Sequence, residues 1–270
     1  MPKKKILISV TTYPLPSRSY DELVCTAGFL EDGTWIRIYP VPLSFLKEVK
    51  KNTSFKKYTW IELDVKQRTD DFRPESHSPN NYDIKIINTL NTDNFWQERK
   101  DICLKNVYTK KSRFIEDSKH PKNVSLITFK PSRITNFIVE DDAKEWKDEW
   151  KEIRKQTDLF AEIETDPEKL IAKVPYKFYY AFEDDEGVSS TLMIEDWEIF
   201  QLYLNCLRDN NNDKEIAIKK VRERYFDEFI KKDIYLFLGT TMQWHRRRSN
   251  NPFVIIGVFY PKIKTQYSLF

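Results

Sequence analysis

Residues 22–39 read ELVCTAGFLEDGTWIRIY, and this stretch decides the fold class because two strand-forming runs flank one tight turn. The turn is Asp32-Gly33, a dipeptide typical of β-hairpins because glycine accepts the positive φ that such turns require. We therefore predict that Glu22–Leu30 and Thr34–Tyr39 pair as antiparallel strands. This hairpin, with the similar runs around it, predicts a mainly β chain.

The second strand of this hairpin has two different faces. Ile36 and Ile38 point to one side, and Trp35, Arg37 and Tyr39 point to the other, because side chains alternate along a strand. The aliphatic side is the expected core face, which leaves Arg37 between two rings on a face exposed to water. An arginine between aromatic residues is also compatible with packing beneath a helix, and the pattern alone does not separate the two arrangements.

Outward from this hairpin, short strands and a few helices alternate with turns. Five strands in the first ninety residues fit a small meander or Greek-key barrel; besides the hairpin they are Lys5–Thr12, Tyr58–Lys66 and Tyr82–Asn88. The rest of the chain repeats this arrangement with helices inserted, and a boundary is expected between residues 90 and 125. The strands expected there are Val124–Phe129, Ile134–Val139, Tyr176–Glu183, Ser189–Ile194, Ile234–Gly239 and Phe253–Tyr260, with helices over 95–107, 143–156, 196–207 and 216–230.

Composition allows a folded core and argues against several classes of protein. The 270 residues include 18 Phe, 14 Tyr and 7 Trp, and each buried ring removes about 150–250 Å² from water. The net charge of +3 is too small for a strong overall positive field, so binding of a polyanion depends on local clusters. Three cysteines without CxxC spacing indicate neither a disulfide framework nor a metal site. No cofactor-binding glycine loop is recognised.

The sequence also bears on the cellular compartment. The apolar run Ile6–Val10 is too short for a signal peptide. No stretch approaches the ~18 apolar residues of a membrane helix. We therefore expect a cytoplasmic protein without a membrane partner.

Six short phrases follow one another along the chain: YPLPS at 13–17, VCTAG at 24–28, WIRIYP at 35–40, RPES at 73–76, DWE at 196–198 and LGT at 238–240. Together they resemble an uncharacterised prokaryotic family, the dual OB-containing domain family. The resemblance implies two small antiparallel OB-like barrels, over residues 1–110 and 111–270, and implies no activity or catalytic residue. OB-type barrels commonly bind single strands or oligosaccharides on one face, although a fold does not establish a function.

The strongest candidate for binding is the basic stretch between the last two predicted strands. It contains Trp244, His245, Arg246, Arg247 and Arg248. Three consecutive arginines beside a tryptophan could hold phosphates while the ring stacks on a base. A solubilising loop is the alternative interpretation.

Further candidates lie in the first ninety residues. Arg73 is predicted to face phosphate, with Glu75 orienting it through a bidentate pair, unless the two only tie their turn together. Arg18, Arg37 and Tyr39 complete the predicted site. The predicted function is binding of nucleic acid, preferably single-stranded, with no evident catalytic site, metal or cofactor.

Two other functions stay open at this point. Asp64, Lys66, Asp71 and Glu75 follow the pattern of acids and a lysine found in some metal-dependent nucleases, where the acids bind Mg²⁺. Alternating charges on the wet face of a strand are equally ordinary. The acidic region Glu140–Glu168 would instead suit a protein partner.

Overall fold

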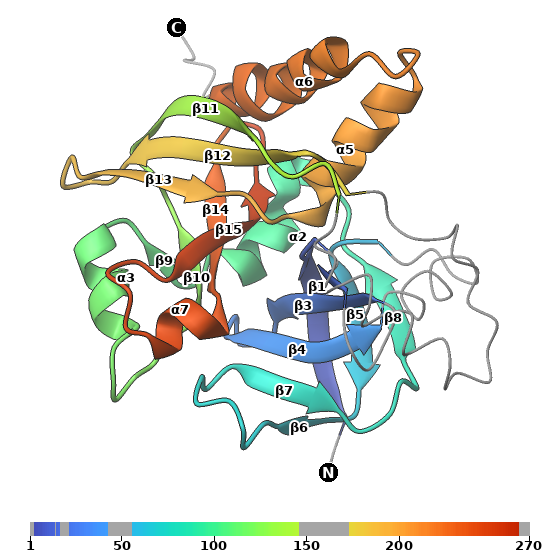
Figure 1. Ribbon diagram of the computed structural model, residues 1–270. Helices are drawn as coiled ribbons and strands as arrows, with labels where there is room; N and C mark the ends of the chain where they lie inside the picture. The colour runs from blue at the N-terminus through green and yellow to red at the C-terminus, as the bar shows by residue number, and fades with distance from the viewer. Residues whose placement is uncertain (1–2, 14, 17–21, 43–55, 146–172, 265–270) are drawn as a thin grey trace, which may run out of the picture.

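The computed structural model describes residues 3–13, 15–16, 22–42, 56–145 and 173–264, and these residues form a mainly β protein (Figure 1). The prediction of a mainly β chain with inserted helices is confirmed. One sheet comes from the first half of the chain, residues 3–105, and two come from the second half, residues 106–264. The predicted division into domains 1–110 and 111–270 stays a prediction.

The predicted hairpin at residues 22–39 is present. Strands β3 (Glu22–Phe29) and β4 (Trp35–Pro42) pair antiparallel, with Ala27 opposite Arg37. Gly33 has a φ of 83°, and the Asp32 carboxylate accepts a hydrogen bond from the Thr34 backbone N–H at 2.9 Å. The turn therefore closes for the local reason that the sequence indicates.

The first sheet curls back on itself. Its order is β6-β7-β4-β3-β1-β5-β8, and β5 (Thr59–Leu63) and β6 (Val65–Gln67) are separated by Asp64 alone. The stretch from β5 to β6 therefore pairs with β1 through β5 and with β7 through β6. The curled sheet encloses aliphatic side chains, among them Ile6, Ile36 and Ile61. The remaining strands are β1 (Lys4–Thr11), β2 (Leu15–Pro16), β7 (Ser76–Pro79) and β8 (Lys85–Thr89).

The second half holds the other two sheets. One has the order β15-β14-β10-β9 and the other the order β11-β12-β13, and a parallel bridge between Ile194 and Ile255 joins them. Only residues 130–132 separate β10 from β11, so the chain passes directly from one sheet into the other. The strands are β9 (Val107–Tyr108), β10 (Leu126–Phe129), β11 (Arg133–Asp141), β12 (Tyr176–Glu183), β13 (Ser189–Met193), β14 (Tyr235–Thr240) and β15 (Phe253–Phe259).

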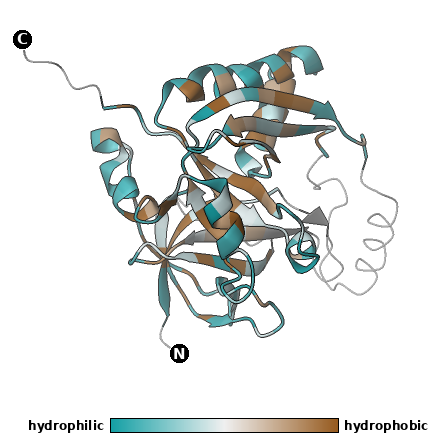
Figure 2. Cartoon of the chain, turned by 90° about the vertical axis from the view of Figure 1, so that its left-hand side faces the viewer, coloured by the Kyte–Doolittle hydropathy of each residue, from teal (hydrophilic) through white to brown (hydrophobic). Residues whose placement is uncertain are grey.

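The helices cover the outer sides of these sheets. Their polar residues face outward and their apolar residues face the core (Figure 2). Asp196 caps α5 by accepting from the Glu198 backbone N–H at 3.1 Å, as an aspartate directly before a helix commonly does. The helices are α2 (Asp93–Cys103), α3 (Lys111–Asp117), α5 (Trp197–Arg208), α6 (Lys214–Arg222) with a π turn (Glu223–Glu228) and a 3₁₀ turn (Phe229–Lys231), and α7 (Met242–Arg246).

The two halves pack face to face through apolar side chains. Leu7, Val10 and Phe29 of the first sheet contact Phe237 and Phe259 of the second. Strand β1 is therefore buried on both faces, since its other face lines the inside of the curled sheet.

This packing overturns the predicted exposed face of β4. The Trp35 ring packs edge-on against Phe237, with the centroids 5.1 Å apart, and Arg37 is only 3% exposed. Tyr39, at the end of the strand, remains 36% exposed. The prediction was wrong for the first two residues because the pattern of one strand cannot show that a second sheet covers its other face.

Two further expectations differ from the structure, and a third lies largely outside the described residues. The pairing is not wholly antiparallel, since β4 pairs with β7 and β10 pairs with β9 in parallel. The stretch before the last strand begins as the short helix α7 and is not a bare hairpin tip. The predicted helix over 143–156 lies largely outside the described residues. Among the described helices, none is long and apolar enough to cross a membrane.

Candidate functional site

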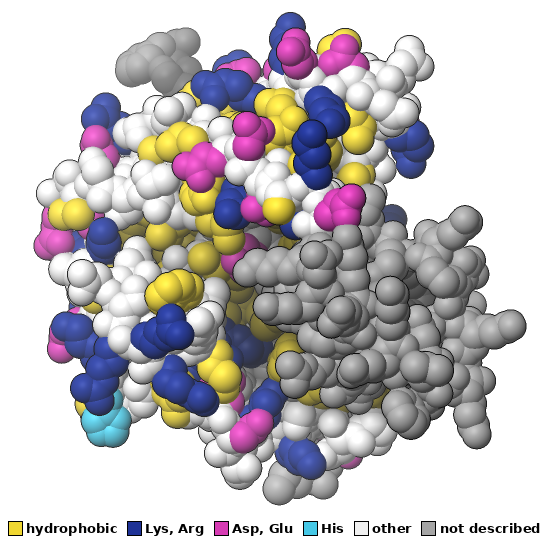
Figure 3. Space-filling view, in the orientation of Figure 1, with side chains coloured by type: hydrophobic (Ala, Val, Ile, Leu, Met, Phe, Trp, Pro, Cys, Tyr) yellow, Lys and Arg dark blue, Asp and Glu magenta, His cyan; other side chains and the backbone are white. Residues whose placement is uncertain are grey.

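A pocket of about 500 Å³ lies between the two halves. The space-filling view shows a hollow with apolar side chains where the halves meet (Figure 3). The first half contributes residues from β3, β4, the segment after β1 and the loop between β6 and β7. The second half contributes the start of β12, the end of β13, the segment after β14 and part of β15. Most of the lining is apolar, with a few charged groups.

Arg37 lines the pocket from the first half, and its guanidinium is bound by the second half. It donates to Ser125 Oγ at 2.8 Å, to the Ser125 carbonyl at 3.3 Å and to Ser76 Oγ at 3.2 Å. Burial lowers the pKa of Arg37. These bonds give Arg37 a structural task at the joint between the halves, in addition to its place on the pocket wall.

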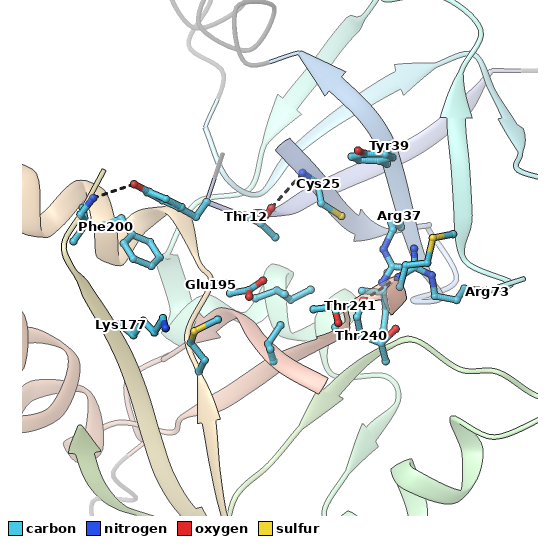
Figure 4. A pocket seen from close by; sticks show the side chains of 18 of the residues that line it. Thr12, Cys25, Arg37, Tyr39, Arg73, Lys177, Glu195, Phe200, Thr240 and Thr241 are labelled. Carbon is cyan, nitrogen blue, oxygen red and sulfur yellow. Dashed lines mark hydrogen bonds between the residues drawn. The ribbon is translucent and has the colours of Figure 1, made fainter. Parts of the chain in front are cut away.

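Arg73 lies beside Arg37 on the same wall (Figure 4). Its guanidinium contacts Asp71, with Nη2 2.6 Å from Oδ2 and Nε 2.9 Å from Oδ1, and it donates to the Thr240 carbonyl at 2.9 Å. Burial would raise the pKa of Asp71, but the hydrogen bonds from Arg73 and Ser76 outweigh it and hold that pKa well below its usual value.

The predicted pair between Arg73 and Glu75 is therefore wrong. Both oxygens of Glu75 are used by Ser125, one by its backbone N–H at 2.9 Å and the other by its hydroxyl at 2.7 Å. The carboxylates of Asp71 and Glu75 both help to tie the halves together.

Tyr39 and Arg68 stand at the edge of the pocket. The Arg68 guanidinium lies 5.3 Å from the centroid of the Tyr39 ring, and it is held by Asp70 at 2.6 Å. Such a cation above a ring stabilises the ring's position by about 0.5–1 kcal/mol at an exposed site. Tyr39 thus remains available as an exposed ring next to the pocket.

The tip, defined as residues Trp244–Arg248, follows Met242, which lines the pocket at the start of α7. Trp244 is 49% exposed, and the Arg247 guanidinium lies 5.4 Å from the centroid of its ring. The guanidiniums of Arg246, Arg247 and Arg248 are exposed and form no ion pair within the described part of the chain. They are free to meet an anion.

His245 does not join its neighbours on the surface. It is buried, with Nδ1 3.0 Å from Thr240 Oγ1 and Nε2 2.7 Å from the Ser118 carbonyl. Burial lowers the pKa of His245. The ring anchors α7 to the body of the protein, so the prediction that it contacts nucleic acid is not supported by its position.

Glu195 is the residue that the sequence reasoning missed. It follows β13 and lines the pocket, between the side that carries Phe200 and the side that carries Arg37 and Arg73 (Figure 4). Its carboxylate has no hydrogen bond or ion pair in the described part of the chain, and burial raises the pKa of Glu195 to about 7. The only signal in the sequence is the alternation that places Glu195 on the same face of the strand as Met193.

A second polar group of the pocket wall also lacks a partner. The Thr241 hydroxyl is buried and makes no hydrogen bond in the described structure. Unsatisfied polar atoms are uncommon in folded proteins and are costly when they stay unpaired. Glu195 and Thr241 are therefore polar groups of the pocket wall that remain available to a ligand.

The residues proposed for a metal-dependent nuclease do not come together. Asp64 accepts from the Asn80 amide at 2.9 Å, while Asp71 and Glu75 are engaged as described above. The described residues contain no group of acids, histidines and cysteines arranged to hold a metal ion. Arg18 and most of the acidic region Glu140–Glu168 lie outside the described residues, so their predicted roles stay predictions.

Two family models match the chain. A domain of unknown function, DUF8758, matches residues 2–105, and a second domain of unknown function, DUF8757, matches residues 111–270. No curated protein matches. The solved structure of a murine DNA-binding protein bound with double-stranded DNA aligns over 99% of this chain and 100% of its own, with a TM-score of 0.32 and 7% identity. A likeness this weak carries no argument about function. The resemblance to the dual OB-containing domain family stays a prediction.

Proposed function

The chain belongs, through residues 111–270, to the DUF8757 family of domains of unknown function, and from its geometry we propose that it binds single-stranded nucleic acid across the pocket mouth. The tip holds the phosphates, and exposed rings offer surfaces for bases. The observation that carries this proposal is the run of three exposed arginines that have no acidic partner among the described residues.

We propose further that each half is an OB-type barrel. In the first half the strand pairing runs from β1 to β3, β4, β7 and the β5–β6 stretch, which returns to β1. In the second half it runs from β11 to β12, β13, β15 and β14, which pairs with β10, the stretch that leads into β11. The strands of the two halves therefore pair in the same order, starting and ending at β1 in the first half and at the β10–β11 stretch in the second.

This assignment places the pocket where OB-type barrels bind their ligands. OB-type barrels bind oligonucleotides and oligosaccharides with their second and third strands and with the loops after the first and fourth. In this chain those elements are β3, β4, the segment after β1 and the 68–75 loop, and their counterparts include β12, β13 and residues 241–252. The pocket is lined by residues from these elements of both halves.

The unpaired arginines distinguish the tip from the rest of the surface. Other exposed arginines have a carboxylate beside them, as in Arg133 with Glu183 at 2.8 Å and Arg208 with Asp209 at 3.0 Å. A paired arginine contributes little field, whereas three unpaired ones create a local positive potential despite the small net charge. Trp244 adds a stacking surface, and stacked bases contribute about 1–3 kcal/mol each.

The test compares two triple variants. In the first, Arg246, Arg247 and Arg248 are changed to Ala. In the matched control, Arg133 of β11, Arg208 of α5 and Lys219 of α6 are changed to Ala, so both variants lose the same charge. Binding of a fluorescent single-stranded oligonucleotide is measured by anisotropy over a range of salt concentrations.

We expect the first variant to bind more weakly, with a slope of log affinity against log salt reduced by about 2, since each lost phosphate contact removes about 0.7. The control should keep the slope of the unmodified protein. Equal slopes in both variants, or no binding by the unmodified protein to single strands of DNA or RNA, would overturn the proposal.

A further inference from the structure

We propose that the pocket takes one unpaired base of the bound strand, and that Glu195 selects guanine by accepting hydrogen bonds from its N1–H and N2–H groups. This inference rests on the proposed function, because the strand brings the base to the pocket mouth. It adds a specificity that the basic tip cannot supply, since phosphate contacts carry no sequence information.

The shape and surface of the pocket suit a flat heterocycle. Its volume of about 500 Å³ lies within the range of small-molecule sites, about 300–1,000 Å³. Its wall includes Phe200 and Tyr13, whose ring centroids lie 4.2 Å apart, and the apolar side chains of Val254 and Ile256. Bases that leave a stack are commonly received between aromatic and apolar side chains of this kind.

Glu195 supplies the polar recognition. Glu195 is half-buried in this wall, and its carboxylate has no donor within the described residues, so a donor on the ligand would satisfy it. Two adjacent N–H groups match the two oxygens of a carboxylate. Among the natural bases only guanine presents two adjacent N–H groups on one edge, whereas adenine and cytosine offer one amino group and thymine and uracil one imino group.

The other charged wall agrees with the same base. The guanidiniums of Arg37 and Arg73 lie together on one side of Glu195 (Figure 4). Guanine carries the acceptors O6 and N7, which arginine commonly recognises. The raised pKa of Glu195, about 7, allows the carboxylate to form near neutral pH when the guanine donors stabilise it.

The experiment uses one pyrimidine oligonucleotide with a single variable position: guanine, adenine, an additional pyrimidine or an abasic site. Affinities for the unmodified protein and three variants are measured by fluorescence anisotropy at pH 7.5. Glu195→Gln keeps the shape of the side chain but replaces one acceptor oxygen by a donor. Met193→Trp fills the pocket and leaves Glu195 in place, and Glu98→Gln, an exposed carboxylate on α2, is the matched control.

We expect the unmodified protein and the Glu98→Gln variant to prefer the guanine strand over the abasic strand by about tenfold, the size of one good bidentate base contact. Glu195→Gln and Met193→Trp should each abolish this preference. Retention of the preference in Glu195→Gln, or its absence in the unmodified protein, contradicts the role of Glu195 even though the strand still binds. Failure of the unmodified protein to bind any of the strands would instead contradict the proposed function itself.

Discussion

Arg37 and Glu195 show how a single residue takes its role from what covers it. Arg37 occupies a position in β4 whose neighbours alternate as an exposed face would, yet Ser125 of the second half receives its guanidinium. Glu195 lies at the end of another strand, and no protein donor reaches it in the described structure. The fold supplies hydrogen-bond partners for the Arg37 guanidinium, and we propose that a ligand supplies those of the Glu195 carboxylate.

The uncompensated carboxyl of Glu195 has a measurable effect on stability. Its pKa of about 7 in the folded protein exceeds the value of about 4.3 for an unfolded chain. Below pH 4 both states hold the proton, so Glu195 costs nothing there. As the pH rises towards 7 and beyond, the unfolded chain releases the proton more readily than the folded one, and the folded state loses stability.

We therefore expect Glu195→Gln to raise Tm, with a larger increase at pH 8 than at pH 5, on the order of 2–4 °C at pH 8 if about 1 kcal/mol is recovered. The measurement is thermal unfolding followed by circular dichroism at the two pH values. An equal change at both pH values would show that Glu195 ionises freely in the folded protein. The charged groups that share its pocket, among them Lys177, Asp142 and Arg73, do not hydrogen-bond to it.

Among the elements, helix α5 is positioned by a contact from the other half of the chain. Lys57, just before β5, reaches Asp196 at the N-terminus of α5, with Nζ 2.8 Å from Oδ1, and also reaches Glu198 at 3.0 Å. The Asp196 side chain is only 1% exposed. Burial opposes the charge on Lys57, but the two carboxylates raise its pKa above the usual value. The cap of α5 therefore also links the helix to the first sheet.

Removing Lys57 leaves a buried charge without its partner. We expect Lys57→Met to lower the free energy of unfolding by about 3–5 kcal/mol, as for other broken buried pairs. Urea unfolding measures this loss, and Lys66→Met, at an exposed position of β6, is the control. Adding Asp196→Asn to Lys57→Met should recover part of the loss. If the double variant is less stable than Lys57→Met alone, the link is not the source of the effect.

Across the whole molecule, the tight packing of the two halves depends on a residue without a side chain. Gly257 in β15 faces Phe237 and Val10, and a Cβ placed there would lie 3.1 Å and 3.2 Å from their side chains. These distances are shorter than ordinary contacts between carbon atoms. A side chain at this position would therefore require Phe237 and Val10 to shift by a few tenths of an ångström.

Enlarging this position should strain the joint between the halves. We expect Gly257→Ala to lower the free energy of unfolding by about 1–3 kcal/mol, and Gly257→Val to lower it more, because overpacking displaces well-fitted side chains. Chemical unfolding followed by tryptophan fluorescence checks this, with the exposed Val188→Ala as a control expected to change by less than about 0.5 kcal/mol. A Gly257→Val variant as stable as the unmodified protein would mean that Phe237 and Val10 accommodate the larger side chain without cost, which contradicts the prediction.

Local patterns predicted the strands well. The Asp32-Gly33 turn, the alternation of Ile36 and Ile38 and the cap at Asp196 each depend on neighbours within a few residues, and each is found in the structure. The same reasoning identified the arginines at 246–248 as exposed, because a charged run between two strands has few other places to lie.

The sequence by itself therefore determined the longer strands, the turn at Asp32-Gly33 and which strand faces are aliphatic, since backbone sterics and side-chain alternation act over short distances. It did not indicate the short strands β2, β7 and β9. Only the tertiary structure decided that Arg37, Arg73 and Glu195 border one pocket, that His245 is buried, and that Asp71 and not Glu75 holds Arg73. The physical reason is that burial and charge pairing depend on which surfaces meet. Partners such as Arg37 and Ser125 are 88 residues apart, and no local pattern records their contact.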